Sequence, residues 1–355
     1  MRIKRLKISN FKSVKDLEFQ CSRVNILIGP PNSGKSNILE SLSLISWMQH
    51  VPGGYGKFDN EHAFDWLRVK ECPQLFHYYD TSSQQIKIEA TLTHTEDGRD
   101  STIDMTVKSI GKETFGFSYA EVAGRGSLIG IASIVSSPDF SHVEFKDKYV
   151  KQEHIFIRFY RYPPILEERL TAGVRNLLPP IGRNISEVFL SGENKSLMKA
   201  VEPMLEELGF ELVLEPERYA FQMKLSGKRV IPFEPYQVSD TFKRMLFHLA
   251  AVLTNDDSVV ALEEPEAHAF PEYLVTLSEQ IALSNNQFFI TTHSPEVIYT
   301  LATKAEEVRK GDFSCFLVSF SRKERRTRLK KLDSGTVRDY ATSILANLDD
   351  FMEEE

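Results

Sequence analysis

The chain has 355 residues, of which 41% are hydrophobic and 26% charged, and these values are typical of a folded globular protein with one large domain or two to three smaller ones. The formal net charge of −7 includes five charges in the tail at 349–355, which leaves −2 for the rest and predicts no general attraction to nucleic acid. Three cysteines without a CxxC pair indicate neither a zinc ribbon nor a disulfide framework. The absence of a signal peptide or a bilayer-length apolar run predicts a cytoplasmic protein without a membrane segment.

The first fifty residues predict strands followed by a helix. The stretches "RIKRLKIS" and "KDLEFQ" are expected to form two strands, and the apolar run "VNILIG" a third that ends in glycines and prolines. The segment "NILESLSLI" then has helical spacing. The order predicted here is strand, Gly/Pro-rich loop, helix.

The middle of the chain has a different hydrophobic pattern, which predicts antiparallel strands and then helices. Between about 86 and 123, the alternation in "IKIEATLTH", "STIDMTVKSI" and "TFGFSYAEVA" predicts antiparallel strands. Helical spacing is expected near 165–178 and 195–209. The segment "YAFQMKLSGKRVIPF" predicts a hairpin that turns at Ser226-Gly227.

From residue 239 onward, strands and helices alternate. A helix, "SDTFKRMLFHLAAVL", precedes the apolar strand Val259–Leu262, and the strands "QFFIT" and "CFLVSF" follow with helices between them. This order predicts a parallel sheet covered by helices. We therefore expect the core to combine residues 1–46 and 236–348, with 47–235 as a β-rich and helical insertion and 349–355 as an acidic tail.

The stretch "GPPNSGKS", Gly29 to Ser36, matches the phosphate-binding pattern G-x-x-x-x-G-K-[ST] between a strand and a helix. Glycines let the backbone curl so that successive N–H groups and the helix N-terminus point at phosphate oxygens. Lys35 is expected to reach the β- and γ-phosphates of ATP, and the Ser36 hydroxyl to ligate Mg²⁺. The nucleotide-binding residues predicted from this loop are Asn32, Ser33, Gly34, Lys35, Ser36 and Asn37.

Two adjacent acids end the buried strand in "VVALEEPEAHAFP". Alone they could be the first solvated residues after a strand, but a P-loop enzyme needs one acid to hold magnesium and a group beside it to position water. We assign these roles to Glu263 and Glu264, respectively. In "FFITTHSPEVI", His293 ends another buried strand, where a neutral imidazole could contact the γ-phosphate or the water. The predicted catalytic residues are Lys35, Glu264 and His293.

With these three motifs in this order, the sequence resembles the ABC-type ATPases of the RecF/SMC/OLD-like group, and in particular its short stand-alone members. The resemblance covers roughly residues 1–45 and 236–300. It implies a fold of the α/β class, a P-loop NTPase head with an antiparallel β subdomain and an inserted α+β lobe. It also identifies Glu263 as the Walker B acid, Pro265 to His268 as the D-loop region, and "NFKS", with Lys12, as the segment near the nucleotide base.

The resemblance further implies that two subunits enclose two ATP molecules, each site completed by a signature helix from the other subunit. Here the chain departs from the family pattern, because Ser239-Asp240-Thr241 replaces the usual Ser-x-Gly, and threonine restricts the close approach that glycine permits. Ser239 is expected to contact nucleotide across an ATP-dependent homodimer; the alternative is an ordinary helix N-cap. A second departure is Glu263, where the family often has aspartate.

The absence of certain sequence motifs argues against two classes of enzyme. Without a D-x-D sequence, no Toprim nuclease is predicted, so any nuclease or other effector would be a partner protein. The absence of N-K-x-D argues against a GTPase. The basic run "SRKERRTRLKK" at 321–331 could contact DNA phosphates or be a solvated surface, and "FIRFYRYPP" at 156–164 favours buried strand packing over base stacking.

We therefore expect a Mg²⁺-dependent ATPase that acts as a nucleotide-driven dimerisation switch in DNA repair or phage defence. One alternative is a nucleotide-gated scaffold that binds ATP with little turnover, which the altered signature favours. Another is the nucleotide-binding subunit of a transporter, which the "NFKS" start and the large insertion disfavour.

Overall fold

The computed structural model describes most of the chain. The described residues are 1–50, 65–82, 84–93, 100–111, 113–150, 154–163, 174–191, 194–207, 209–214, 219–225, 229–233, 237–308, 311–333 and 337. Within them, no helix combines the length and the apolar character that crossing a membrane requires.

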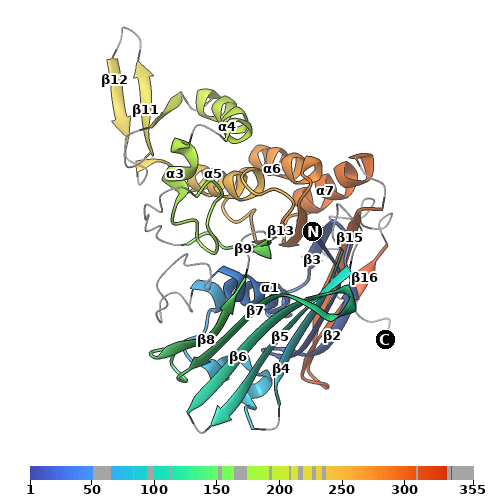
Figure 1. The fold of residues 1–355 in the computed structure, drawn as a ribbon. Helices are drawn as coiled ribbons and strands as arrows, with labels where there is room; N and C mark the ends of the chain where they lie inside the picture. The colour runs from blue at the N-terminus through green and yellow to red at the C-terminus, as the bar shows by residue number, and fades with distance from the viewer. Residues whose placement is uncertain are drawn as a thin grey trace.

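A six-stranded, mostly parallel sheet forms the core predicted from the alternating strands and helices (Figure 1). Its strands, in spatial order, are β16 (Arg326–Leu332), β15 (Phe313–Ser321), β3 (Val24–Ile28), β14 (Gln287–Thr291), β13 (Val259–Glu263) and β9 (Ile157–Tyr160). β16 runs antiparallel to β15, whereas the other five strands all run parallel to one another. The loops at the carboxyl ends of β3, β14, β13 and β9 therefore meet at one edge of the sheet.

The two faces of this sheet pack against different layers. α5 (Asp240–Leu253), α6 (Pro271–Leu283) and α7 (Pro295–Val308) cover one face, whereas α1 (Lys35–His50) packs on the other (Figure 1). In β13, Val259 and Ala261 belong to the core that contains α1, and Val260 and Leu262 to the core that contains α5 to α7. This explains the continuous apolar run, because both faces of the strand are buried.

A seven-stranded antiparallel sheet packs on the outer side of α1. Its strands, in spatial order, are β2 (Val14–Gln20), β1 (Arg2–Phe11), β4 (Ile86–Thr93), β5 (Asp100–Gly111), β6 (Thr114–Ala123), β7 (Ser127–Ser136) and β8 (Val143–Tyr149). The alternating burial along β4 confirms the predicted period of two. Trp47 of α1 joins the layers, since its ring centroid lies 5.4 Å from that of Phe117 and 6.4 Å from that of Phe140.

A smaller lobe extends beyond α5 at the upper left of Figure 1. It contains α3 (Ile185–Leu190), α4 (Lys195–Glu207), β10 (Phe210–Leu214), β11 (Tyr219–Leu225) and β12 (Arg229–Phe233). β11 and β12 pair as the predicted hairpin, and its predicted turn at Ser226-Gly227 lies outside the described residues. Short 3₁₀ turns, η1 (Cys72–Leu75), η2 (His77–Tyr79) and η3 (Gly124–Gly126), connect elements of the larger body.

The prediction of a helix near 165–178 is wrong for the residues that the structure describes. Residues 174–178 form no helix, and 164–173 lie outside the described residues. The apolar spacing instead reflects a buried loop, in which the backbone N–H of Leu177 donates to Thr254 Oγ1 and that of Leu178 to Asn184 Oδ1. Pro179 follows directly, and the residue before a proline is disfavoured in helical conformation.

The division of the chain into a core and an insertion at 47–235 stays a prediction. One strand from that range, β9, pairs with β13 at the edge of the parallel sheet. Its buried packing agrees with the interpretation of "FIRFYRYPP" as a strand.

Candidate functional site

The loop Gly29–Ser36 connects β3 to α1, which begins at Lys35. Gly29 and Gly34 have φ values of 147° and 103°, a region that favours glycine. The loop folds back on its lysine, because Lys35 Nζ donates to the carbonyl oxygens of Gly29 at 2.8 Å and Pro30 at 2.9 Å. Burial lowers the pKa of this amine, and the carboxylates of Glu264 and Glu266 oppose that shift. The amine thus lies inside the loop at the N-terminus of α1, where phosphate binding requires it.

A directed chain of hydrogen bonds holds this loop against β16. Asn37 Nδ2 donates to Ser13 Oγ at 2.6 Å, Ser13 Oγ lies 2.7 Å from Thr327 Oγ1, and Thr327 Oγ1 donates to the carbonyl of Ser33 at 3.2 Å. Thr327 contacts the loop so closely that a Cβ on Gly34 would lie 2.1 Å from Thr327 Oγ1. The second glycine is therefore required by a neighbouring side chain as well as by its own φ.

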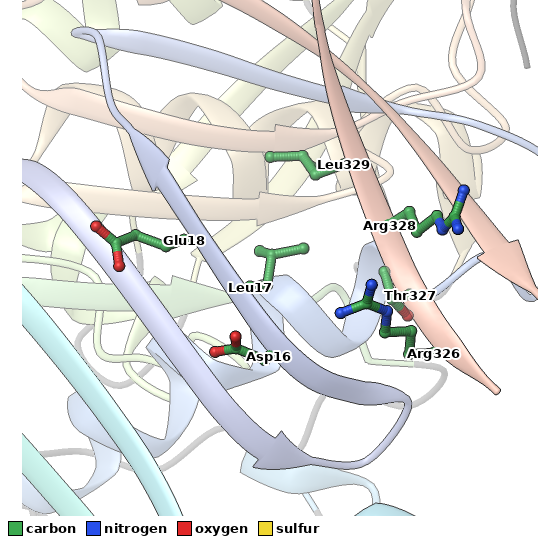
Figure 2. A pocket seen from close by; sticks show the side chains of 7 residues that line it. All are labelled: Asp16, Leu17, Glu18, Arg326, Thr327, Arg328 and Leu329. Carbon is green, nitrogen blue, oxygen red and sulfur yellow. The ribbon is translucent and has the colours of Figure 1, made fainter. Parts of the chain in front are cut away.

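Thr327 also lines a polar hollow of about 410 Å³ between β2 and β16 (Figure 2). Asp16 and Glu18 lie on its β2 side, and Arg326 and Arg328 on its β16 side. Thr327 lines this hollow and also contacts the phosphate loop, through the carbonyl of Ser33. The hollow contains none of the predicted site residues.

Glu263, Glu264 and His293 come together at the edge of the sheet where β3 also ends. β14 lies between β3 and β13, and Glu263 is paired in register with Thr291, the last residue of β14. The backbone N–H of Glu264 donates to the Thr291 carbonyl at 3.0 Å, and His293 Nε2 lies 3.6 Å from Glu264 Oε1. Burial and the charge of Lys35 lower the pKa of His293, with Glu264 opposing. The imidazole is therefore neutral at pH 7.

Glu263 is a buried carboxylate at the centre of an ion-pair cluster. Its Oε2 accepts a hydrogen bond from Arg161 Nε at 2.5 Å and another from Arg68. Burial opposes ionisation of Glu263, but the charges of Arg161 and Arg68 and the hydrogen bond from Arg161 outweigh it and lower its pKa. The lowered pKa keeps Glu263 ionised at neutral pH.

The same cluster includes a second buried carboxylate, Glu40 of α1. It accepts from Arg161 Nη2 at 2.8 Å and from Lys12 Nζ, which also donates to the carbonyl of Leu67 at 2.6 Å. Burial lowers the pKa of Lys12, with Glu40 opposing. The cluster, defined here as Lys12, Glu40, Arg68, Arg161 and Glu263, contains three cations and two anions.

Lys12 therefore has an observed role besides the predicted one near the nucleotide base. It fixes the "NFKS" turn to α1 through Glu40, whereas its predicted contact with nucleotide stays a prediction. Asn32, at the exposed tip of the loop, has a left-handed φ of 59°.

Ser239 is the N-cap of α5, and its side chain accepts a hydrogen bond from the backbone of Phe242 at 3.3 Å. Thr241 Oγ1 donates to the carbonyl of His268 at 2.6 Å, which ties the signature segment to the D-loop region. Ser239 remains exposed. The capping alternative is thus realised, and it leaves one side of the serine accessible.

Several residues at this edge were not predicted. Arg161, Arg68, Glu40, Glu266 and Thr327 all contact predicted site residues. Glu266 Oε1 accepts a hydrogen bond from the backbone N–H of His293 at 2.5 Å, so it positions the segment that carries the histidine. Arg161 was interpreted as part of a packed strand; its place directly after a buried parallel strand is the signal that would have identified it.

The donors present suit Mg²⁺ bound together with a nucleotide. Mg²⁺ is usually held by one or two protein groups plus phosphates and waters, and the Ser36 hydroxyl and the Glu263 carboxylate are donors of this kind at the ends of the phosphate loop and of β13. The described residues contain no group of three or more metal-ligating side chains.

Residues 24–298, well over half of the chain, match the family model described as "AAA domain, putative AbiEii toxin, Type IV TA system". The chain belongs to this AAA-domain family. It is accordingly an ATPase with a P-loop fold, as predicted. The matched range begins at β3 and includes the phosphate loop, both strand-end acids and His293.

One curated protein and one solved structure are similar to this chain over most of its length. An "ATP/GTP phosphatase" of Helicobacter pylori is 22% identical over 345 residues, which cover 88% of this chain and 90% of the relative. A solved SMC head bound to the C-terminal winged-helix domain of ScpA has a TM-score of 0.51 at 15% identity, and the alignment covers 94% of this chain and 98% of that one. The second likeness confirms the predicted fold class.

The contact between Gly34 and Thr327 predicts that the Gly34→Ala protein loses nucleotide affinity. Overpacking of this kind costs about 1–3 kcal/mol, which corresponds to roughly 5- to 150-fold in Kd. Binding of a fluorescent ATP analogue measures the loss. Gly209→Ala is the matched control, because Gly209 has a φ of 73° with no atom within 4 Å of the added Cβ; it should leave affinity unchanged. Equal affinities for both variants and the wild type would contradict this interpretation of the loop.

Proposed function

We propose that this ATPase is a Mg²⁺-dependent switch of the ABC type, in which ATP binding brings two subunits together and hydrolysis separates them. The observation that carries the proposal is the convergence, at one edge of the parallel sheet, of the phosphate loop, the two strand-end acids and His293. Lys35 and the backbone of the loop bind the phosphates. Ser36 and Glu263 hold the metal, which neutralises phosphate charge.

Glu264 is the residue we propose to orient and deprotonate the attacking water. Its side chain is 44% exposed and comes directly after Glu263, so a water beside the γ-phosphate is within its reach. The neutral imidazole of His293 lies next to it and offers a hydrogen bond to the same water or to the phosphate. Glu266 holds the His293 backbone in place, which fixes the distance between the two groups.

ATP is the proposed substrate in preference to GTP, because the chain has no N-K-x-D sequence. The alternative, a scaffold that binds ATP with little turnover, rests on Ser239-Asp240-Thr241. The two functions differ in catalytic rate and share the same site.

A role in DNA repair or phage defence with a partner protein is part of the proposal. The family description, which names a toxin–antitoxin system, and the ScpA domain bound to the similar SMC head support a switch that acts through another macromolecule. For DNA contact, the basic run at 321–331 forms the end of β15, a turn and β16. Glu324 pairs with Arg326 at 2.5 Å and Arg328 at 2.7 Å, so part of the positive charge is neutralised locally.

Steady-state ATP hydrolysis tests the catalytic assignment. Lys35→Ala should abolish ATP binding and turnover together, whereas Glu264→Gln should keep binding and lower the rate by roughly 10²- to 10⁴-fold, the usual contribution of a positioned general base. Glu279→Gln is a matched control, since the Glu279 side chain is also 44% exposed, and it should behave as the wild type. An unchanged rate in both site variants would rule out this active site; a wild-type rate near background would favour the scaffold.

Light scattering on the Glu264→Gln protein tests dimerisation. The mass should double from 40.6 kDa only when Mg·ATP is present. In this background, Ser239→Asp preserves the N-cap but sets a negative charge toward the γ-phosphate of the other subunit, so the doubling should disappear. Ser239→Asn preserves the cap without charge and should still dimerise. A mass independent of nucleotide would contradict the switch.

A further inference from the structure

Two guanidinium groups donate hydrogen bonds to the same carboxylate oxygen of Glu263. Arg161 Nε and Arg68 Nη2 both donate to Glu263 Oε2. A carboxylate oxygen has two lone-pair positions, and both are used here by charged donors. This oxygen is therefore closed to a metal ion while both arginines remain, and their positive charges repel a cation brought beside them.

The two arginines are held very differently. Arg161 is 15% exposed, and it also donates to Glu40 at 2.8 Å and to the Asp65 carbonyl at 3.1 Å and packs over the Phe159 ring at 4.9 Å. Arg68 is 44% exposed, and among the described residues its second carboxylate partner, Glu40, is 3.8 Å away. Several contacts thus hold the Arg161 side chain in place, whereas the exposed Arg68 side chain can replace its hydrogen bond to Glu263 with hydrogen bonds to water.

The backbone around Arg68 is fixed independently of its side chain. Ser43 Oγ donates to the carbonyl of Trp66 at 2.5 Å, and Lys12 Nζ donates to that of Leu67. Arg68 itself has a left-handed φ of 48°, a conformation that persists only when the surroundings impose it. Release of Glu263 therefore requires a rotation of one side chain and no rearrangement of the segment.

We propose that Arg68 is a positioning residue that competes with the metal for Oε2 of Glu263 and releases this oxygen when Mg·ATP binds. The inference rests on the proposed function, because it takes Glu263 as the metal-binding acid. Arg161 remains in place and keeps Glu263 and Glu40 oriented. Arg68 thereby couples the occupancy of the metal site to the segment that follows α1.

Metal affinity tests the proposal directly, with Mn²⁺ as a spectroscopic substitute for Mg²⁺. In the Glu264→Gln background with saturating ATP, electron paramagnetic resonance of free Mn²⁺ gives the half-saturating metal concentration. Arg68→Ala should lower this concentration about threefold, the effect of removing one partly exposed ion pair that opposes binding. Arg68→Gln, which keeps the length without the charge, should lower it similarly. Arg68→Lys should resemble the parent protein because its ammonium can still pair with Glu263.

Arg5→Ala is the matched control. Arg5 is also 44% exposed and pairs with Glu18 at 2.9 Å on the antiparallel sheet, so its removal should leave Mn²⁺ affinity unchanged. Unchanged or weaker Mn²⁺ binding in Arg68→Ala and Arg68→Gln would overturn the competition. Failure of the parent protein to bind Mn²⁺ with ATP would instead refute the proposed function, so the two failures are distinguishable.

Discussion

The parallel pairing of β3, β14, β13 and β9 is the constraint on which the candidate site depends. Parallel strands end at the same edge of a sheet, so residues far apart in the sequence become neighbours there. The phosphate loop follows β3, Glu263 ends β13, and Arg161 follows β9. None of these residues has a site role by itself; the register of the strands gives them one.

Buried charge imposes the second constraint. Glu40 and Glu263 are almost completely buried, and ionised carboxylates in such surroundings require opposite charges and hydrogen bonds. Lys12, Arg68 and Arg161 meet this need and at the same time join α1, the β1–β2 turn and the end of β9. The same set of interactions therefore stabilises the fold at this edge and sets the electrostatic environment of Glu263.

Site features that depend on local spacing could be predicted from the sequence, whereas contacts between residues far apart in the chain could not. The phosphate loop and the double acid after Leu262 could be predicted because their chemistry requires fixed spacing along the chain. Glu40 could not, since a glutamate within a helical pattern indicates nothing about a partner 121 residues away. Thr327 was hidden within a basic run, and its contact with Gly34 depends on a strand pairing that spacing does not encode.

Hydrogen–deuterium exchange of the Glu264→Gln protein, with and without Mg·ATP, tests most directly whether nucleotide binds at this edge of the sheet. The account predicts slower exchange, on adding Mg·ATP, of the backbone amides in the loop 29–37 together with those at 263–264 and 291–293, because ligand and metal contact all three segments. Protection confined to other parts of the chain, or to the loop without the two strand ends, would contradict the site described here.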